Sequence, residues 1–143
     1  MTTAIILRAY PIGYAAGVFD MFHIGHLNLL KRAKENCGKL IVGVTTDEAV
    51  MRNKSKSPII PFADRMEIVR QCKYVDDVVA QDDLDKVAAW RKLHYDVLFV
   101  GNDWQGTPKW IEYERQLNSH GVDVVYFPYT KEISSTQLRK LVG

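Results

Sequence analysis

Two histidines three positions apart are the strongest chemical signal in this 143-residue sequence. His23 and His26 lie where an apolar segment gives way to a helical pattern, with Gly25 between them. Residues i and i+3 share one face at the start of a helix, so both imidazoles can face one ligand beside the positive end of the helix dipole. Backbone N–H groups at a helix start also bind anions. The spacing therefore predicts a site for a phosphate group.

Glycines beside the pair favour this interpretation. Gly17 would let the chain turn sharply after the apolar segment, and Gly25 would let a phosphate approach the backbone without meeting a side chain. Asp20 would tie the loop to backbone amides. A structural histidine pair and a metal pair are the alternatives. Zinc usually takes three or four clustered protein ligands, and His94 and His120 lie in segments of peripheral character, so no metal site is predicted.

A second anion-binding pattern lies near the end of the sequence. Ser134, Ser135 and Thr136 precede a helical pattern in which Leu138 and Leu141 would face the core. Hydroxyl groups at a helix start cap the helix and, with the N–H groups there, can hold an anion. The alternative is an ordinary helix cap. The presence of the histidine motif in the same chain favours the anion site.

Five apolar runs alternate with helical patterns, at residues 14–18, 40–44, 75–79, 97–100 and 122–127. Continuous apolar runs indicate strands buried on both faces, and helices between them imply right-handed crossovers. The sequence therefore predicts an α/β fold, a doubly wound parallel sheet of about five strands, as one domain over residues 1–143 with its core at about 14–140. Ligands bind such sheets at the carboxyl ends of the strands, where His23, Asp103 and Ser134 occur.

Basic residues follow the second predicted strand. Residues 52–57 form the longest polar stretch and are predicted to be a mobile loop. Lys54 and Lys56 could close over a triphosphate and neutralise its charge, or could simply be solvated. A helix is predicted to begin at residues 61–65, where Arg65 could bind a phosphate or pair with Asp64 or Glu67.

Asp103 and Trp104 follow the fourth predicted strand. The carboxylate could bind Mg²⁺, accept hydrogen bonds from a sugar or polyol, or form an Asx turn, and its place after a strand favours contact with a ligand. Trp104 could stack on a ligand. Aromatic side chains more often supply core area, so we expect Trp104 to pack.

Composition argues against several classes of function. A formal net charge of +2, without a basic strip interleaved with aromatics, argues against a nucleic-acid partner. The apolar residues 4–7 are far too few for a signal peptide or a membrane span, so a cytoplasmic protein without a membrane partner is predicted. Cys37 and Cys72 lack the spacing of a metal knuckle and are expected to be buried thiols.

The run around His23 and His26 resembles the HxGH signature of the nucleotidyltransferase superfamily, and residues 133–140 resemble its second motif. Intermediate segments narrow the resemblance to the cytidylyltransferase family, and within it to the bacterial glycerol-3-phosphate cytidylyltransferases. The resemblance implies a Rossmann-like fold. The intermediate and final segments match in family order and are residues 44–48, 54–56, 74–78, 101–104 and 133–136.

The resemblance assigns roles by position. His23 and His26 would contact the α and β phosphates of a nucleoside triphosphate, and Asp103 would lie at the nucleotide site. Lys54 and Lys56 would lie beside the α phosphate and the acceptor phosphate. The other predicted nucleotide-binding residues are Gly17, Val18, Phe19, Gly25, Ser134, Ser135 and Thr136, with the serines at the distal phosphates. The predicted acceptor-binding residues are Lys73, Trp104, Tyr129 and Thr130.

Several positions depart from the family pattern. Val18 replaces a threonine, which removes a hydroxyl from the phosphate loop. Lys73 replaces an arginine, which keeps the charge but loses bidentate recognition. Tyr129 stands where the family's Arg-Thr-Glu-Gly-Ile-Ser ending begins, and Lys131 and Glu132 replace its Glu-Gly. The acceptor is therefore left open between glycerol 3-phosphate and another small phosphorylated alcohol.

The implied reaction is direct in-line attack of an acceptor phosphate on the α phosphorus of CTP, with Mg²⁺ accompanying the triphosphate and no covalent intermediate. The implied partners are small molecules, and a homodimer is a family expectation. Phosphate motifs do not read the base, so adenylyl transfer from ATP is an alternative. A non-catalytic nucleotide-binding module and a scaffolding domain are the others.

Overall fold

Five parallel strands form one sheet with the order β3-β2-β1-β4-β5 in the computed structural model, which describes residues 10–128. The elements, in chain order, are β1 (Tyr10–Gly17), α2 (Ile24–Glu35), β2 (Cys37–Thr45), α3 (Asp47–Lys54), α4 (Phe62–Arg70), β3 (Asp77–Gln81), α5 (Lys86–Leu93), β4 (Val97–Gly101), a 3₁₀ turn (Asn102–Trp104), α6 (Pro108–Ser119) and β5 (Asp123–Phe127). The predicted α/β fold with five parallel strands is confirmed.

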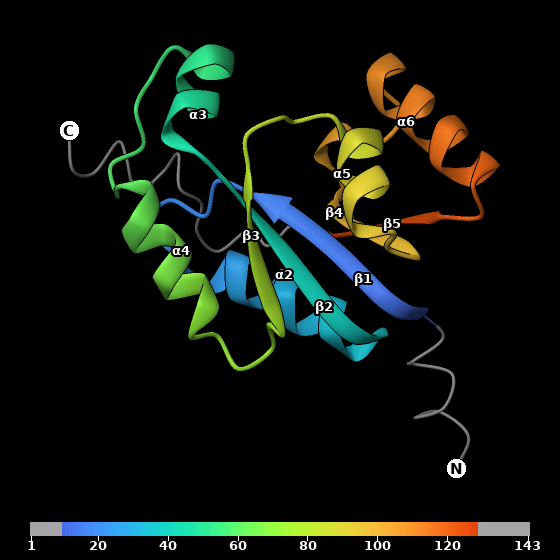
Figure 1. The fold of residues 1–143 in the computed structure, drawn as a ribbon, viewed down its shortest axis with the longest axis horizontal. Helices are drawn as coiled ribbons and strands as arrows, with labels where there is room; N and C mark the ends of the chain where they lie inside the picture. Colours follow the sequence, from blue (N-terminus) through green and yellow to red (C-terminus); the bar gives the residue numbers. More distant parts are fainter. Residues whose placement is uncertain (1–9, 129–143) are drawn as a thin grey trace.

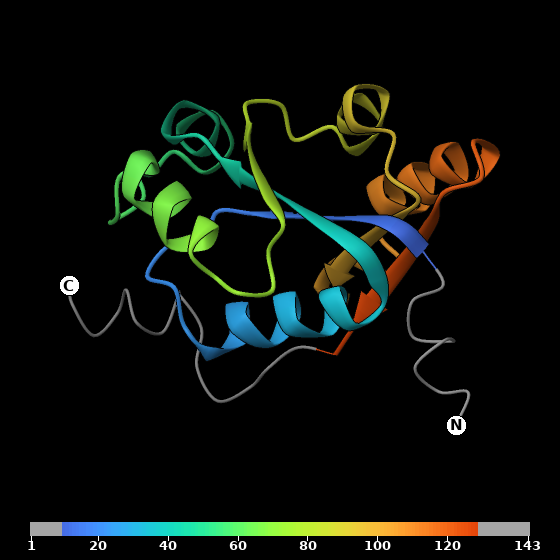
Figure 2. The ribbon, with the colours of Figure 1, turned by 60° about the horizontal axis from the view of Figure 1, so that its bottom comes forward.

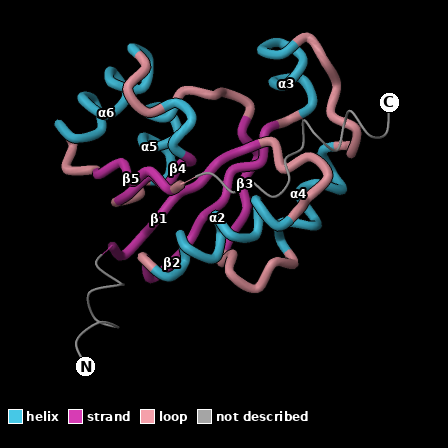
Figure 3. Tube along the Cα trace, turned by 180° about the vertical axis from the view of Figure 1, so that it is seen from behind, coloured by secondary structure: helices cyan, strands magenta, loops and turns pink. Residues whose placement is uncertain are grey.

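Helices cover both faces of the sheet (Figure 1, Figure 2). Leu30 of α2 and Val69 of α4 belong to one buried cluster, and α2 and α4 lie over the same face when the molecule is seen from behind (Figure 3). Val87 of α5 and Leu117 of α6 belong to a second buried cluster on the opposite face. Because both faces are covered, the strands are the nearly continuous apolar runs seen in the sequence.

Every strand differs from its predicted bounds by at least one residue, and β2 begins at Cys37 rather than Leu40. Two other strands begin at least two residues away from the prediction. β1 begins at Tyr10 rather than Tyr14, and it ends at Gly17. β3 begins at Asp77 because the chain at Val75 still forms a turn, in which its amide donates to the Cys72 carbonyl. Both differences shift the ends of a strand and leave the strand order unaffected.

The sheet opens between β1 and β4. The chain leaves β1 toward β2 on one side and returns to β4 on the other, which makes this pair the switch point of the topology. The two strands pair only between residues 13–15 and 97–99. Their carboxyl ends, at Gly17 and Gly101, therefore have no ladder between them, and a crevice can form there.

The described residues add two further observations. Cys37 is a buried thiol that donates to the Ala33 carbonyl, whereas Cys72, also expected to be buried, is only partly buried. Between residues 10 and 128, none of the helices has the length and apolar character needed to cross a membrane.

Candidate functional site

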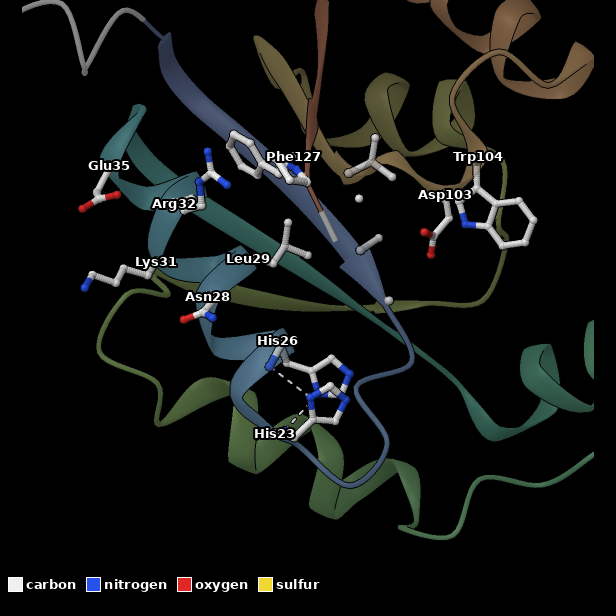
Figure 4. Close-up of a pocket in the computed structure, with 16 residues that line it drawn as sticks. His23, His26, Asn28, Leu29, Lys31, Arg32, Glu35, Asp103, Trp104 and Phe127 are labelled. Atoms are coloured by element: carbon white, nitrogen blue, oxygen red, sulfur yellow. Dashed lines mark hydrogen bonds between the residues drawn. The ribbon is translucent and has the colours of Figure 1, made fainter. Parts of the chain in front are cut away.

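The two histidines form the start of α2. His23 is the residue that caps the helix, and its Nδ1 accepts a hydrogen bond from the amide of Gly25 at 3.0 Å. His26 reaches back, and its Nδ1 accepts from the amide of His23 at 3.2 Å. The two rings stack with their centroids 3.9 Å apart, as the close-up shows (Figure 4). The predicted placement of both imidazoles on one face at a helix start is confirmed.

These hydrogen bonds fix the protonation pattern of the pair. A neutral imidazole has one donor and one acceptor nitrogen, and in both rings Nδ1 accepts from a backbone N–H. The proton of each neutral ring is therefore on Nε2. Burial lowers the pKa of His23, and burial with the neighbouring His23 lowers the pKa of His26 to about 4. At neutral pH the pair presents two uncharged Nε2–H donors.

The loop before the pair turns at positions that the sequence did not indicate. We predicted a sharp turn at Gly17, but the residues with left-handed backbone are Phe19, with φ 56°, and Met21, with φ 51°. The Phe19 ring is buried and lies 5.3 Å from the His26 ring. The Val18 carbonyl accepts from the Arg65 guanidinium. Val18 and Phe19 therefore support the loop, and neither is among the residues that line the cavity beside the histidines.

A cavity of about 610 Å³ opens beside the histidines at the carboxyl ends of β1 and β4 (Figure 4). The predicted site residues that line it are Gly17, His23, Gly25, His26, Asp103 and Trp104. Two of the three predicted segments thus converge on one cavity. The third, with Ser134, Ser135 and Thr136, lies outside the described residues, as do Tyr129 and Thr130.

Sequence reasoning missed the far wall of this cavity. Arg32 lines it, and its guanidinium carbon lies 4.8 Å from the centre of the Phe127 ring (Figure 4). Within the described part of the chain, no carboxylate pairs with Arg32. Helical spacing from Gly25 was the available signal, because residues 25, 28, 29 and 32 fall on one side of a helix and all line the cavity.

The predictions for the loop at residues 52–57 and for three lysines differ from the structure. Residues 52–54 are not loop but the last turn of α3, because Thr46 caps this helix and Ser55 ends it in a left-handed conformation. Lys54 and Lys56 are exposed and do not line the cavity. Lys73 is exposed beside Tyr74 and precedes β3, which places it at the amino edge of the sheet, opposite the cavity.

Arg65 and Trp104 also differ from expectation. Arg65 is fully buried and bonds to three backbone carbonyls and Asp47, so it neither faces a phosphate nor pairs with Asp64 or Glu67. Trp104 is 58% exposed, so the expected packing role is wrong. It is the last residue of a 3₁₀ turn that carries it away from the core and onto the cavity rim.

A parallel sheet with a helix start and a cavity at its switch point is typical of nucleotide-binding domains of the Rossmann-like class. The chain belongs to the cytidylyltransferase-like family, whose model matches residues 14–141. The predicted superfamily and the prediction of a nucleotidyltransferase are thereby confirmed at the level of the family.

Two named relatives and one solved structure give finer comparisons. The chain is 35% identical over 127 residues to the FAD synthase of Pyrococcus abyssi, covering 88% of this chain and 86% of that protein. It is 34% identical over 126 residues to the glycerol-3-phosphate cytidylyltransferase of Bacillus spizizenii, covering 87% and 91%. The lipopolysaccharide core biosynthesis protein from Thermoplasma volcanium superposes with a TM-score of 0.70 at 27% identity, covering 87% and 100%.

Proposed function

We propose that this protein transfers CMP from CTP to a small phosphorylated alcohol, with glycerol 3-phosphate as the first candidate. An oxygen of the acceptor phosphate attacks the α phosphorus, and the bond from the α phosphorus to the oxygen that bridges to the β phosphate breaks. Pyrophosphate leaves with that electron pair. The products are CDP-glycerol and pyrophosphate. The acceptor phosphate is already ionised, so the reaction needs no general base.

The histidine pair is the observation that carries this proposal. Two neutral Nε2–H groups at a helix N-terminus can donate to phosphate oxygens, and the dipole of α2 favours the charge that these oxygens gain. Neutral rings are suited to this task because each can donate its Nε2–H to a phosphate oxygen without taking up or giving up a proton. Fixed donors need no reorganisation in the transition state, which is the main source of electrostatic catalysis.

Magnesium enters this proposal as part of the triphosphate substrate. Among residues 10–128, the carboxylates that line the cavity are Asp103, in the turn after β4, and Glu35, at the end of α2 away from the histidines. Mg²⁺ commonly uses one or two carboxylates together with substrate phosphates, and Asp103 could supply one of them. Lys54 at the end of α3 and Lys56 in the segment after it would neutralise the α phosphate and the leaving pyrophosphate.

Adenylyl transfer to FMN is the second candidate. It is supported by the similarity to FAD synthase, which equals that to glycerol-3-phosphate cytidylyltransferase within one per cent identity. FAD is FMN joined to AMP through a pyrophosphate link, so the same attack on an α phosphorus would form it. The exposed Trp104 on the cavity rim offers an aromatic surface on which a flavin ring could stack.

The test is pyrophosphate release with Mg²⁺, in which CTP and ATP are each combined with glycerol 3-phosphate, phosphocholine and FMN. We expect release with CTP and glycerol 3-phosphate. Release only with CTP and phosphocholine would show that the acceptor is a phosphorylated alcohol other than glycerol 3-phosphate. Release only with ATP and FMN would replace the first candidate with the second. Triphosphate binding without release from any combination would contradict both and favour a binding module.

A further inference from the structure

The phosphate loop between β1 and α2 is held in a strained form. Phe19 and Met21 both have positive φ although neither is glycine, and such backbone persists only where surrounding contacts hold it. Asp20 lies between them and is almost fully buried. The contacts of Asp20 therefore decide whether the loop keeps the shape that presents the histidines.

Asp20 connects this loop to residues 55–60, the segment after α3 that contains Lys56. Its two carboxylate oxygens accept hydrogen bonds from the amides of Ile59 and Ile60 at 2.8 and 2.9 Å. The segment is thus bound at its far end, while at its near end Ser55 closes α3 with φ 56°. Lys56 lies between these two fixed points. Its position relative to the histidines depends on the carboxylate of Asp20.

Arg65 makes the second connection between the same parts. Its side chain has no exposed surface, and Nη1 donates to the carbonyls of Val18 and Thr45 at 2.8 and 2.7 Å. Nε donates to the Ile60 carbonyl at 2.8 Å, and Nη2 bonds to Asp47 at 2.6 Å. One guanidinium therefore joins the phosphate loop, the end of β2, the start of α3 and the end of the lysine segment.

We propose that Asp20 and Arg65 form a latch that sets the lysine-bearing segment, residues 55–60, against the phosphate loop. Both are positioning residues, since neither lines the cavity. The inference rests on the proposed function, because it assumes that lysines and histidines act on one triphosphate. The latch makes the two loops one unit, so a change in either residue releases both loops together.

Hydrogen exchange tests the latch without any substrate. Asp20→Asn keeps the size of the side chain but replaces one of the two acceptor oxygens with a donor. Exchange in residues 18–23 and 55–60 is expected to become faster in both segments, while β2 keeps its protection. Arg65→Lys, which keeps the charge but not the fork of donors, is expected to do the same. Faster exchange in only one segment would overturn the latch.

Turnover then separates a positioning role from a merely structural one. With whichever substrate pair the wild type uses, Asp20→Asn is expected to lower kcat by up to about 10²-fold, the scale of a small misplacement, with little change in the KM for triphosphate. Arg70→Gln on α4, which loses only an exposed pair with Glu67, is the matched control and should turn over like the wild type. A lower melting temperature with unchanged kcat would contradict positioning. If the wild type turns over no pair, the proposed function fails while exchange still decides the latch.

Discussion

The two sets of side chains that we propose act on phosphate are held in opposite ways. The histidines are fixed by backbone hydrogen bonds at the start of α2, and burial keeps them neutral. Lys54 and Lys56 are exposed, and within residues 10–128 neither lysine side chain makes a hydrogen bond or an ion pair. The backbone around the histidines fixes their side chains directly, whereas no contact within residues 10–128 fixes the orientation of the two lysine side chains.

The difference assigns different tasks to the two sets. Ordered neutral donors give directional hydrogen bonds to charge that develops in the transition state. Flexible lysines act as mobile point charges, and their effect is screened by salt because they are exposed. The contribution of the histidines to turnover should therefore depend on geometry, and the contribution of the lysines should depend on ionic strength. The following predictions test that contrast.

The largest effect is expected at the histidine pair. His26→Ala removes one fixed Nε2–H donor and should lower turnover by on the order of 10²-fold or more with the fold intact, as lost oxyanion donors do. Steady-state pyrophosphate release and circular dichroism check this. His120→Ala, at an exposed histidine that stacks on Trp90 outside the cavity, is the matched control. Unchanged turnover in His26→Ala would remove this histidine from the mechanism.

The neutral state of His26 should also make stability depend on pH. Its folded pKa of about 4 lies below the ordinary value of 6.5, so the unfolded chain binds the proton more readily. Stability is therefore expected to fall as pH drops from 7 toward 4, by about 1 to 2 kcal/mol between pH 7.5 and pH 5. Urea unfolding at the two pH values measures it. In His26→Gln this part of the pH dependence should disappear; an identical dependence would contradict the assignment.

A smaller effect is expected at the lysines. Lys54→Ala should lower kcat by about tenfold, with little loss of CTP affinity, if the lysine acts mainly on transition-state charge. The difference in kcat between the wild type and Lys54→Ala should become smaller as the salt concentration is raised, because screening lowers the kcat of the wild type more than that of the variant. Lys92→Ala, at an exposed lysine of α5, is the control. Equal losses of CTP affinity and turnover would instead favour a binding role.

The sequence predicted the parts of the fold that depend on local pattern. The strands are buried runs, so their composition indicated them directly, as with Val97–Gly101. The start of α2 followed from the spacing of His23 and His26, because that spacing depends only on helix geometry. Asp103 was placed by its position after a strand. In each case neighbours in the sequence determine the outcome.

Contacts between distant segments could not be predicted in the same way. Arg65 bonds to groups near residues 18, 45 and 60, so its burial depends on three loops meeting in space. The sharp turn was assigned to Gly17, whereas the residues with left-handed backbone are Phe19 and Met21, on either side of the buried Asp20. Arg32 was missed because Phe127, the ring beneath it, comes from the last described strand. Local propensity carries no information about such partners.

Nitrogen-15 NMR of the histidine side chains tests the central claim, that the pair acts as neutral Nε2–H donors to a triphosphate. In the free protein, His26 is predicted to show the Nε2–H tautomer and to titrate near pH 4. Addition of CTP should shift the Nε2–H resonances of both His23 and His26. An Nδ1–H tautomer, or a midpoint at the ordinary pKa of 6.5 with no response to either CTP or ATP, would contradict the account.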